Sequence, residues 1–170
     1  MIANIQPDYK LAEQEANSLL KKECFAAPPV LADEIAKNVG LKVYSIGFSS
    51  LDFPFGDISG FIDANTNTMY INSDEPPKRQ NFTIAHELGH FILGHIKEED
   101  YKLLFRKSQL ERDKLKIEKE ANCFAANLLV PTTFIKKIIS DYPFITNYQL
   151  SNLFGVSETV IRHRRSYIGV

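Results

Sequence analysis

Tryptophan is absent from this chain of 170 residues, and cysteine occurs only twice. Cys24 and Cys123 are far apart in the sequence. Two cysteines at this spacing form neither a disulfide framework nor a CxxC metal clip, and they fit a reducing compartment. The sequence therefore indicates neither a fold held by disulfides nor a metal site built from cysteines.

The chain also lacks a strong charge of either sign and any long apolar run. Its formal net charge is −1, which gives no global attraction to nucleic acid or to an anionic membrane. No segment approaches the roughly 18 apolar residues that span a bilayer. The first ten residues contain no basic stretch followed by an apolar one, as a signal peptide would. We therefore expect a soluble cytoplasmic protein without a membrane partner.

The composition is that of an ordinary globular protein, with 44% hydrophobic residues. Hydrophobic periodicity and turn residues predict an α+β fold in which a small, three-stranded, mostly antiparallel sheet packs against helices. We expect a main domain over residues 1–140 and a small helical segment, packed on it, over 141–170. The expected strands are 41–46, 58–63 and 68–72, the last two forming a hairpin, and the expected helices are 9–23, 30–38, 78–93, 117–130, 132–139, 147–154 and 157–167.

The most informative motif is HELGH, residues 86–90. On a helix, the spacing of four residues places the imidazoles of His86 and His90 on one face, one turn apart, where they can share one metal ion, with zinc expected. Glu87 lies beside them and can act as a general base toward water that the metal activates. The motif therefore predicts two ligands and one catalytic carboxylate.

A hydrolytic zinc site needs a third protein ligand. His95 lies beyond Gly94 and on the far side of the helix, so we do not favour it. The segment 117–131 offers two carboxylates, Glu118 and Glu120. Glu118 shares its helical face with small and apolar residues that allow a close approach, and with Asn122, which could hydrogen-bond a ligand histidine. We prefer Glu118, and Glu120 remains the alternative.

The segments NFTIAHELGHFILGH (81–95) and IEKEANCFAANLLVP (117–131) together resemble the ImmA/IrrE family of zinc metallopeptidase domains. The resemblance extends over about residues 10–140. In that family a glutamate precedes an alanine–asparagine pair, which corresponds to Glu118 here. Val130 stands where methionine is common. The pattern also excludes the class with three histidine ligands, because Leu93 and Ile96 occupy the positions where that class has glycine and histidine.

The resemblance implies a zincin-like fold and a gluzincin-type endopeptidase. It implies Zn²⁺ held by His86, His90 and Glu118, with Glu87 as the catalytic base. It further implies a protein substrate, a helix-turn-helix transcriptional repressor encoded nearby, and hence an anti-repressor role in a prophage, mobile element or toxin–antitoxin pair. The alternative is a regulator-binding or toxin–antitoxin module that keeps the fold without proteolysis.

Two details of the active site stay open at the level of sequence. The residues of suitable type to stabilise an oxyanion are Tyr70, His95, Tyr101 and His163. We also expect the strand 68–72 to be the sheet edge beside the HELGH helix, where an extended substrate could pair with it.

The carboxyl-terminal segment resembles a helix-turn-helix, with Gly155 in the turn. Its second helix is basic and carries Arg162, Arg164 and Arg165, which could contact DNA. That helix is short, and the overall charge gives little drive from counterion release. We therefore expect a helical cap on the protease and do not expect DNA binding.

Overall fold

The computed structural model describes residues 6–50, 58–96 and 111–170. Two helices, α1 (Tyr9–Lys22) and α2 (Ala32–Asn38), precede the strands β1 (Lys42–Ile46), β2 (Gly60–Asp63) and β3 (Thr68–Asn72). A 3₁₀ turn, η1 (Phe48–Ser50), follows β1. The remaining elements are all helical: α3 (Pro77–Ile92), α4 (Glu111–Leu129), α5 (Thr132–Asp141), α6 (Asn147–Phe154) and α7 (Glu158–Ile168). The predicted α+β fold is confirmed.

The sheet has the order β1-β3-β2, and its pairing differs from the prediction. The hairpin of β2 and β3 is antiparallel, as expected, but β1 runs parallel to β3. A parallel pair requires a connection of about a dozen residues or more, and the chain between β1 and β3 supplies it. The sheet is therefore mixed: the antiparallel hairpin is confirmed, and the mostly antiparallel pairing that we expected does not extend to β1.

β3 lies in the middle of the sheet, so the expectation that strand 68–72 forms an edge is also wrong. Both sides of its backbone are already paired. Met69 and Ile71 are fully buried against the helical layer. These two residues face the core together, because the positions of a strand that point to one face recur with a period of two. An added extended chain could pair only at β1 or β2.

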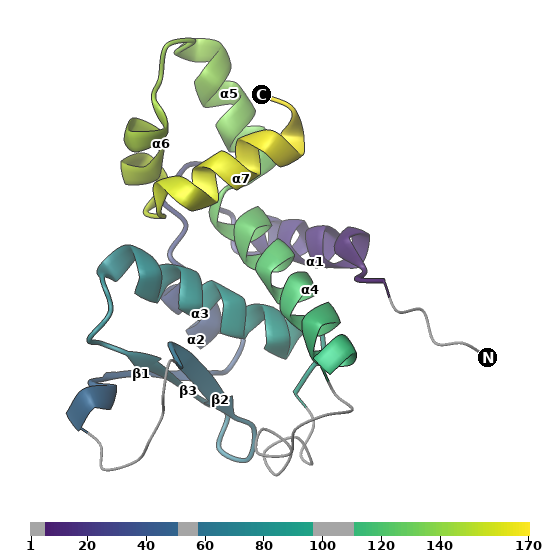
Figure 1. Cartoon of the computed structure of the whole chain (residues 1–170), viewed down its shortest axis with the longest axis vertical. Coiled ribbons are helices and arrows are strands. Elements are labelled where there is room, and N and C mark those ends of the chain that lie inside the picture. Colours follow the sequence, from purple (N-terminus) through teal and green to yellow (C-terminus); the bar gives the residue numbers. More distant parts are fainter. Residues whose placement is uncertain (1–5, 51–57, 97–110) are drawn as a thin grey trace.

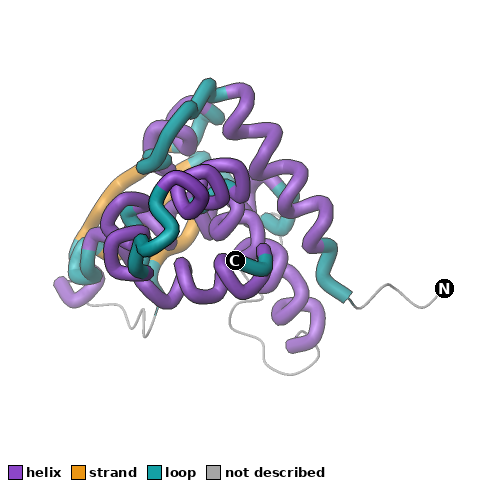
Figure 2. The backbone as a smooth tube through the Cα atoms, turned by 90° about the horizontal axis from the view of Figure 1, so that it is seen from above, coloured by secondary structure: helices purple, strands orange, loops and turns teal. Residues whose placement is uncertain are grey.

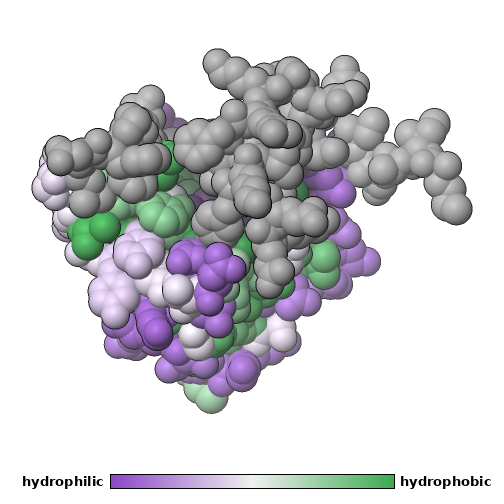
Figure 3. Space-filling model, turned by 90° about the horizontal axis from the view of Figure 1, so that it is seen from below, coloured by the Kyte–Doolittle hydropathy of each residue, from purple (hydrophilic) through white to green (hydrophobic). Residues whose placement is uncertain are grey.

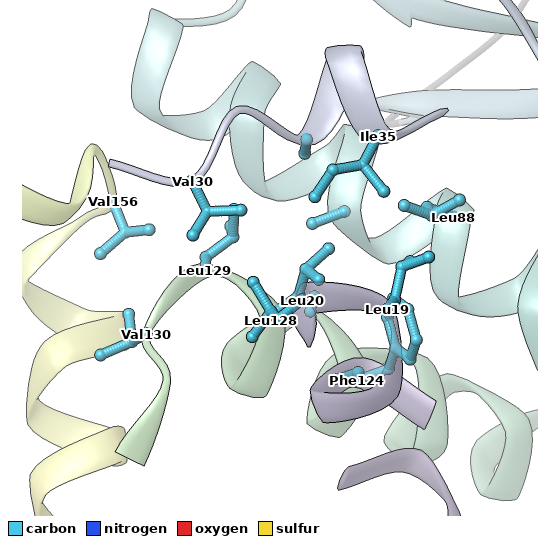
Figure 4. Packing of buried hydrophobic residues seen from close by; sticks show 14 of the residues in the cluster. Leu19, Leu20, Val30, Ile35, Leu88, Phe124, Leu128, Leu129, Val130 and Val156 are labelled. Atoms are coloured by element: carbon cyan, nitrogen blue, oxygen red, sulfur yellow. The ribbon is translucent and has the colours of Figure 1, made fainter. Parts of the chain in front are cut away.

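The hydrophobic core lies between the sheet and the helices and continues into the carboxyl-terminal helices. Leu19 and Leu20 from α1, Ile35 from α2 and Leu88 from α3 face Phe124 and Leu128 of α4 (Figure 4). Val130 and Val156 extend the same cluster toward α6 and α7 (Figure 4). Helix α4 thus packs against both α1 and α3.

In Figure 1, α3 lies over the sheet and α4 crosses one end of α3, while α5, α6 and α7 gather at the opposite end of the molecule from the strands. Viewed from above, the strands form one side of the molecule and helices fill the rest (Figure 2). On the opposite face, where grey atoms do not cover it, hydrophilic and hydrophobic residues are mixed (Figure 3). Helices α3 and α4 therefore meet in the interior of the molecule.

α6 and α7 form the predicted pair around Gly155, which ends α6 with a φ of 66°. Ser157 caps α7 by accepting from the backbone N–H of Val160. Arg164 on α7 is only 3% exposed, and its guanidinium donates to Val130 O and Asn127 Oδ1. This links the last helix to the end of α4. The division into domains 1–140 and 141–170 stays a prediction.

Among the described residues, no single helix is long and apolar enough to cross a membrane. The consecutive helices α4 and α5 are long and apolar enough only when taken together, as a pair that is bent by 46° at its junction.

Candidate metal centre

Three side chains from two helices converge where α3 meets α4. His86 and His90 project from α3, and Glu118 projects from the first half of α4. One ligand-type atom from each lies within 4.8 Å of the others. The two Nε2 atoms are 3.0 Å apart, and Glu118 Oε2 lies 3.2 Å from His86 Nε2 and Oε1 3.7 Å from His90 Nε2.

These separations fit a tetrahedral metal ion. Ligand atoms about 2.0–2.2 Å from a tetrahedral zinc lie roughly 3.2–3.6 Å from one another. The observed spacings of 3.0 to 3.7 Å span that range. The donor set of two imidazole nitrogens and one carboxylate oxygen is also one that catalytic zinc sites use. The residues present could therefore hold a divalent metal.

Asn122 lies one turn after Glu118 and contacts the other edge of the His86 ring. Its Oδ1 is 3.0 Å from His86 Nδ1. Because an amide oxygen only accepts, this contact places the hydrogen of a neutral His86 ring on Nδ1 and leaves its Nε2 free to bind a metal. Asn122 therefore lies where it could hold the ring of His86 in one orientation, as its predicted role requires.

His90 has a different neighbour. Its Nδ1 lies 3.1 Å from Nδ1 of His95, and Nε2 of His95 lies 3.0 Å from Oε2 of Glu120. Glu120 Oε1 in turn accepts the backbone N–H of Asp8 at 2.6 Å. Glu120, the alternative third ligand, therefore points away from His86 and toward the start of α1, while Glu118 faces both HELGH histidines.

The electrostatics of the site follow from burial and from these pairs. Hydrogen bonds with His86 and His90 hold the pKa of Glu118 well below its usual range. Burial by itself would lower the pKa of His86, but its hydrogen bond with Glu118 and the charge of Glu87 raise it on balance. Burial, together with the charge of His90, lowers the pKa of His95.

Glu87 differs from its neighbour Glu118. Burial raises the pKa of Glu87 to about 7; the charge of His86 opposes this shift and that of Glu118 adds to it. A carboxyl with a pKa near neutrality can both take up and release a proton at physiological pH, which is the property of a general base.

The candidates for oxyanion stabilisation are separated by the fold. Tyr70 stacks with Tyr44 and lies tilted against Phe61. It alternates along β3 with Met69 and Ile71, which face the core. His95 is engaged by His90 and Glu120, and Tyr101 lies outside the described residues. His163 borders a cavity of about 310 Å³ whose other lining residues are Phe82, Asn122, Ala126 and Val160. His163 thus shares this cavity with Asn122, which contacts His86.

The family model described as IrrE N-terminal-like domain (Peptidase_M78) matches residues 41–166, well over half of the chain. This chain belongs to the ImmA/IrrE family of metallopeptidase domains. The resemblance inferred from the two motif segments is thereby confirmed.

The curated relatives carry names of the same kind. Metallopeptidase ImmA of Bacillus subtilis is 30% identical over 131 residues, covering 67% of this chain and 75% of ImmA. The radiation response metalloprotease IrrE of Deinococcus deserti is 33% identical over 99 residues, covering 56% of this chain. This chain spans only 34% of that IrrE. A transcriptional regulator of Mycobacterium tuberculosis has the same fold, with a TM-score of 0.69, 17% identity, and coverage of 92% of this chain and 46% of the regulator.

The sequence placed His95 on the far side of the helix and did not predict its contact with His90. The sequence feature that could have indicated this contact is the position of His95 just past Gly94, which has a φ of 69°. This left-handed residue ends α3 and turns the chain back, and the backbone N–H of His95 donates to His90 O. Only that turn brings the imidazole of His95 back to His90.

Proposed function

We propose that this protein is a zinc-dependent endopeptidase of the gluzincin type that cleaves a partner protein. The observation that carries the proposal is the convergence of His86, His90 and Glu118, at separations suited to one tetrahedral ion, next to Glu87. Membership of a metallopeptidase family supports it.

We assign the metal ligands to His86, His90 and Glu118. Zinc suits two imidazoles and a carboxylate better than magnesium or calcium does, because those ions prefer oxygen ligands only. When bound, zinc supplies Lewis-acid chemistry, polarising the scissile carbonyl and making water more acidic. The fixed Nδ1–H···Oδ1 contact from His86 to Asn122 keeps one ligand ring in the orientation that this chemistry needs.

Glu87 is the residue that moves protons. In the ionised form its carboxylate accepts a proton from the attacking water, and in the protonated form it delivers the proton to the leaving amine. Both steps are accessible near neutral pH because burial raises its pKa to about 7. Glutamine at this position keeps the shape of the side chain but can do neither.

The cavity beside Asn122 is a candidate site for a substrate side chain. Three of its five lining residues, Phe82, Ala126 and Val160, are apolar. A cavity of about 310 Å³ can take a large aliphatic or aromatic side chain next to the scissile bond. We infer a preference for such a residue, with the backbone of the substrate pairing at an edge strand of the sheet.

The partner that we propose is a helix-turn-helix repressor encoded nearby, so that proteolysis would relieve repression. The curated relatives, a metallopeptidase and two radiation response metalloproteases, support the proteolysis in this proposal, and the repressor substrate is what the resemblance to the family implies. The competing function is a binding module that grips a regulator without cleaving it. A binding module does not require Glu87, whereas a peptidase does.

One experiment separates these functions. Bound zinc and cleavage of the neighbouring repressor are measured for the wild type, for Glu87→Gln and for Glu34→Gln, an exposed glutamate on α2 that serves as the matched control. A peptidase keeps its zinc in all three and loses cleavage only in Glu87→Gln, by about 10²–10⁴-fold. Tight repressor binding without cleavage by the wild type supports the binding module. A wild type that takes up no zinc rejects the metal site.

A further inference from the structure

Behind His90, on the edge of its ring opposite to Glu118, lies a second buried pair, His95 and Glu120. The side chains of both are 9% exposed. They come from different elements, His95 from the turn after α3 and Glu120 from α4. Neither contributes an atom to the three-residue metal group. Their contacts form a continuous path from His90 to the backbone of Asp8.

The direction of each hydrogen bond along this path follows from the chemistry of its far end. A carboxylate can only accept, and Glu120 accepts the backbone N–H of Asp8 through Oε1 at 2.6 Å. Its other oxygen, Oε2, is 3.0 Å from His95 Nε2, so that nitrogen must carry the hydrogen. A neutral imidazole has one N–H, which leaves Nδ1 of His95 as an acceptor.

The acceptor on His95 then determines the state of His90. Nδ1 of His95 lies 3.1 Å from Nδ1 of His90, so His90 must donate from Nδ1. The lone pair of His90 Nε2 is thereby directed toward His86 and Glu118, where a metal would bind. With the hydrogen placed the other way round, Nε2 would be protonated and could not bind a metal.

We propose that His95 and Glu120 are positioning residues that impose the metal-binding tautomer and ring orientation on His90, with the backbone of Asp8 holding the far end. This role rests on the proposed zinc site. It parallels the contact of Asn122 with His86, but it uses a histidine as an intermediate and reaches across to α1. Neither residue would touch the substrate.

Variants that preserve shape test this role. In Glu120→Gln the single amide oxygen cannot accept from both Asp8 N–H and His95 Nε2–H, so the path loses its fixed direction. His95→Phe keeps the ring volume and removes both polar atoms. His95→Asn restores an acceptor near the position of Nδ1 and should recover part of the function. Glu75→Gln, at a partly buried glutamate bonded to Ser59 and Arg79, is the matched control.

The first measurement is the zinc dissociation constant by competition with a chelator, together with thermal unfolding of the zinc-free proteins. We expect zinc binding to weaken about 10–100-fold in Glu120→Gln and His95→Phe, to recover partly in His95→Asn, and to be unchanged in Glu75→Gln. Affinity within about threefold of wild type in both Glu120→Gln and His95→Phe overturns the role. If the wild type itself binds no zinc, the proposed function fails and this role fails with it.

The second measurement needs no variant. Long-range ¹H–¹⁵N spectra of the zinc-free wild type report which imidazole nitrogen carries the hydrogen. We expect it on Nε2 of His95 and on Nδ1 of His90. A hydrogen on Nδ1 of His95 contradicts the proposed direction even if the chain binds zinc, so this result separates failure of the positioning role from failure of the metal site.

Discussion

Gly89 of α3 lies so close to Phe124 of α4 that a Cβ atom on Gly89 would stand 3.0 Å from Phe124 Cδ1 and 3.2 Å from Phe124 Cβ. The same added atom would lie 3.2 Å from the backbone oxygen of Ala121. Phe124 is fully buried, and a backbone oxygen cannot rotate away. The glycine inside HELGH therefore sets how closely the two ligand-bearing helices approach.

Gly89→Ala should weaken zinc binding, because the methyl group separates α3 from α4 and withdraws Glu118 from the histidines. Alanine favours a helix over glycine by about 1 kcal/mol, whereas overpacking a rigid contact costs about 1–3 kcal/mol, so the free energy of unfolding should also fall slightly. Chelator competition and urea unfolding measure the two effects. Lys119→Ala, at an exposed position of α4, is the control.

Relief of the contact provides a sharper form of the same test. Phe124→Leu in the Gly89→Ala background should recover part of the lost zinc affinity, although it costs stability by itself. If Gly89→Ala binds zinc as tightly as the wild type, the close approach of the helices does not govern the metal site.

The stability of chelator-treated protein should depend on pH through Glu87. Its pKa is about 7 in the folded chain and 4.5 in the reference state, so between these values the folded chain holds a proton that the unfolded chain releases. Folding therefore becomes less favourable as the pH rises through this window, by at most about 3 kcal/mol, and no contribution remains below about pH 4.5.

Glu87→Gln removes that titration. Urea unfolding of the zinc-free proteins gives the free energy of unfolding of the variant minus that of the wild type. This difference should be larger at pH 8 than at pH 4, in favour of the variant. Glu34→Gln, at an exposed position, should show no such change. A stability difference between Glu87→Gln and wild type that is the same at both pH values would contradict a raised pKa for Glu87.

Arg164 should matter for folding and not for DNA. Its guanidinium donates to Val130 O at 2.9 Å, Asn127 Oδ1 at 2.6 Å and Thr132 Oγ1 at 2.7 Å, and it joins α7 to the junction of α4 and α5. Arg164→Met leaves these acceptors without their donor, so we expect a loss of about 2–4 kcal/mol in the free energy of unfolding.

Arg162→Met is the matched control for Arg164→Met, because Arg162 is exposed on the same helix, and it should change stability by less than about 0.5 kcal/mol. Arg165 is also engaged, with Nη1 3.0 Å from Asn147 Oδ1. These internal contacts support the prediction that the carboxyl-terminal segment does not bind DNA. Salt-dependent DNA binding that Arg162→Met abolishes would reject that prediction.

Filling the cavity beside Asn122 should change substrate selection without disturbing the metal. Ala126→Leu projects into that space, so kcat/KM for substrates with a large apolar residue next to the scissile bond should fall at least about 10-fold. Zinc content should stay at the wild-type level. Ala27→Leu, at an exposed position, is the control. An unchanged kcat/KM for every substrate would show that the cavity receives no substrate side chain.

The HELGH helix and its face were predictable because helical periodicity relates residues four apart whatever surrounds them. Helix α6 and strand β3 also begin and end where the sequence predicts. α4 begins at Glu111, six residues before its predicted start. The dense charges before Ile117 suit an exposed helix as well as a loop, so the sequence pattern left this boundary open.

The sequence by itself determined the local patterns: the two histidines on one helical face, the glutamate beside them, and the small residues around Glu118 that allow a close approach. Only the tertiary structure decided what depends on contacts between distant segments. It placed β3 in the centre of the sheet, turned Glu118 toward the histidines and Glu120 toward Asp8, and brought His95 back against His90. Local propensity acts over a few residues, whereas these choices follow from how α3, α4 and α1 pack around one core.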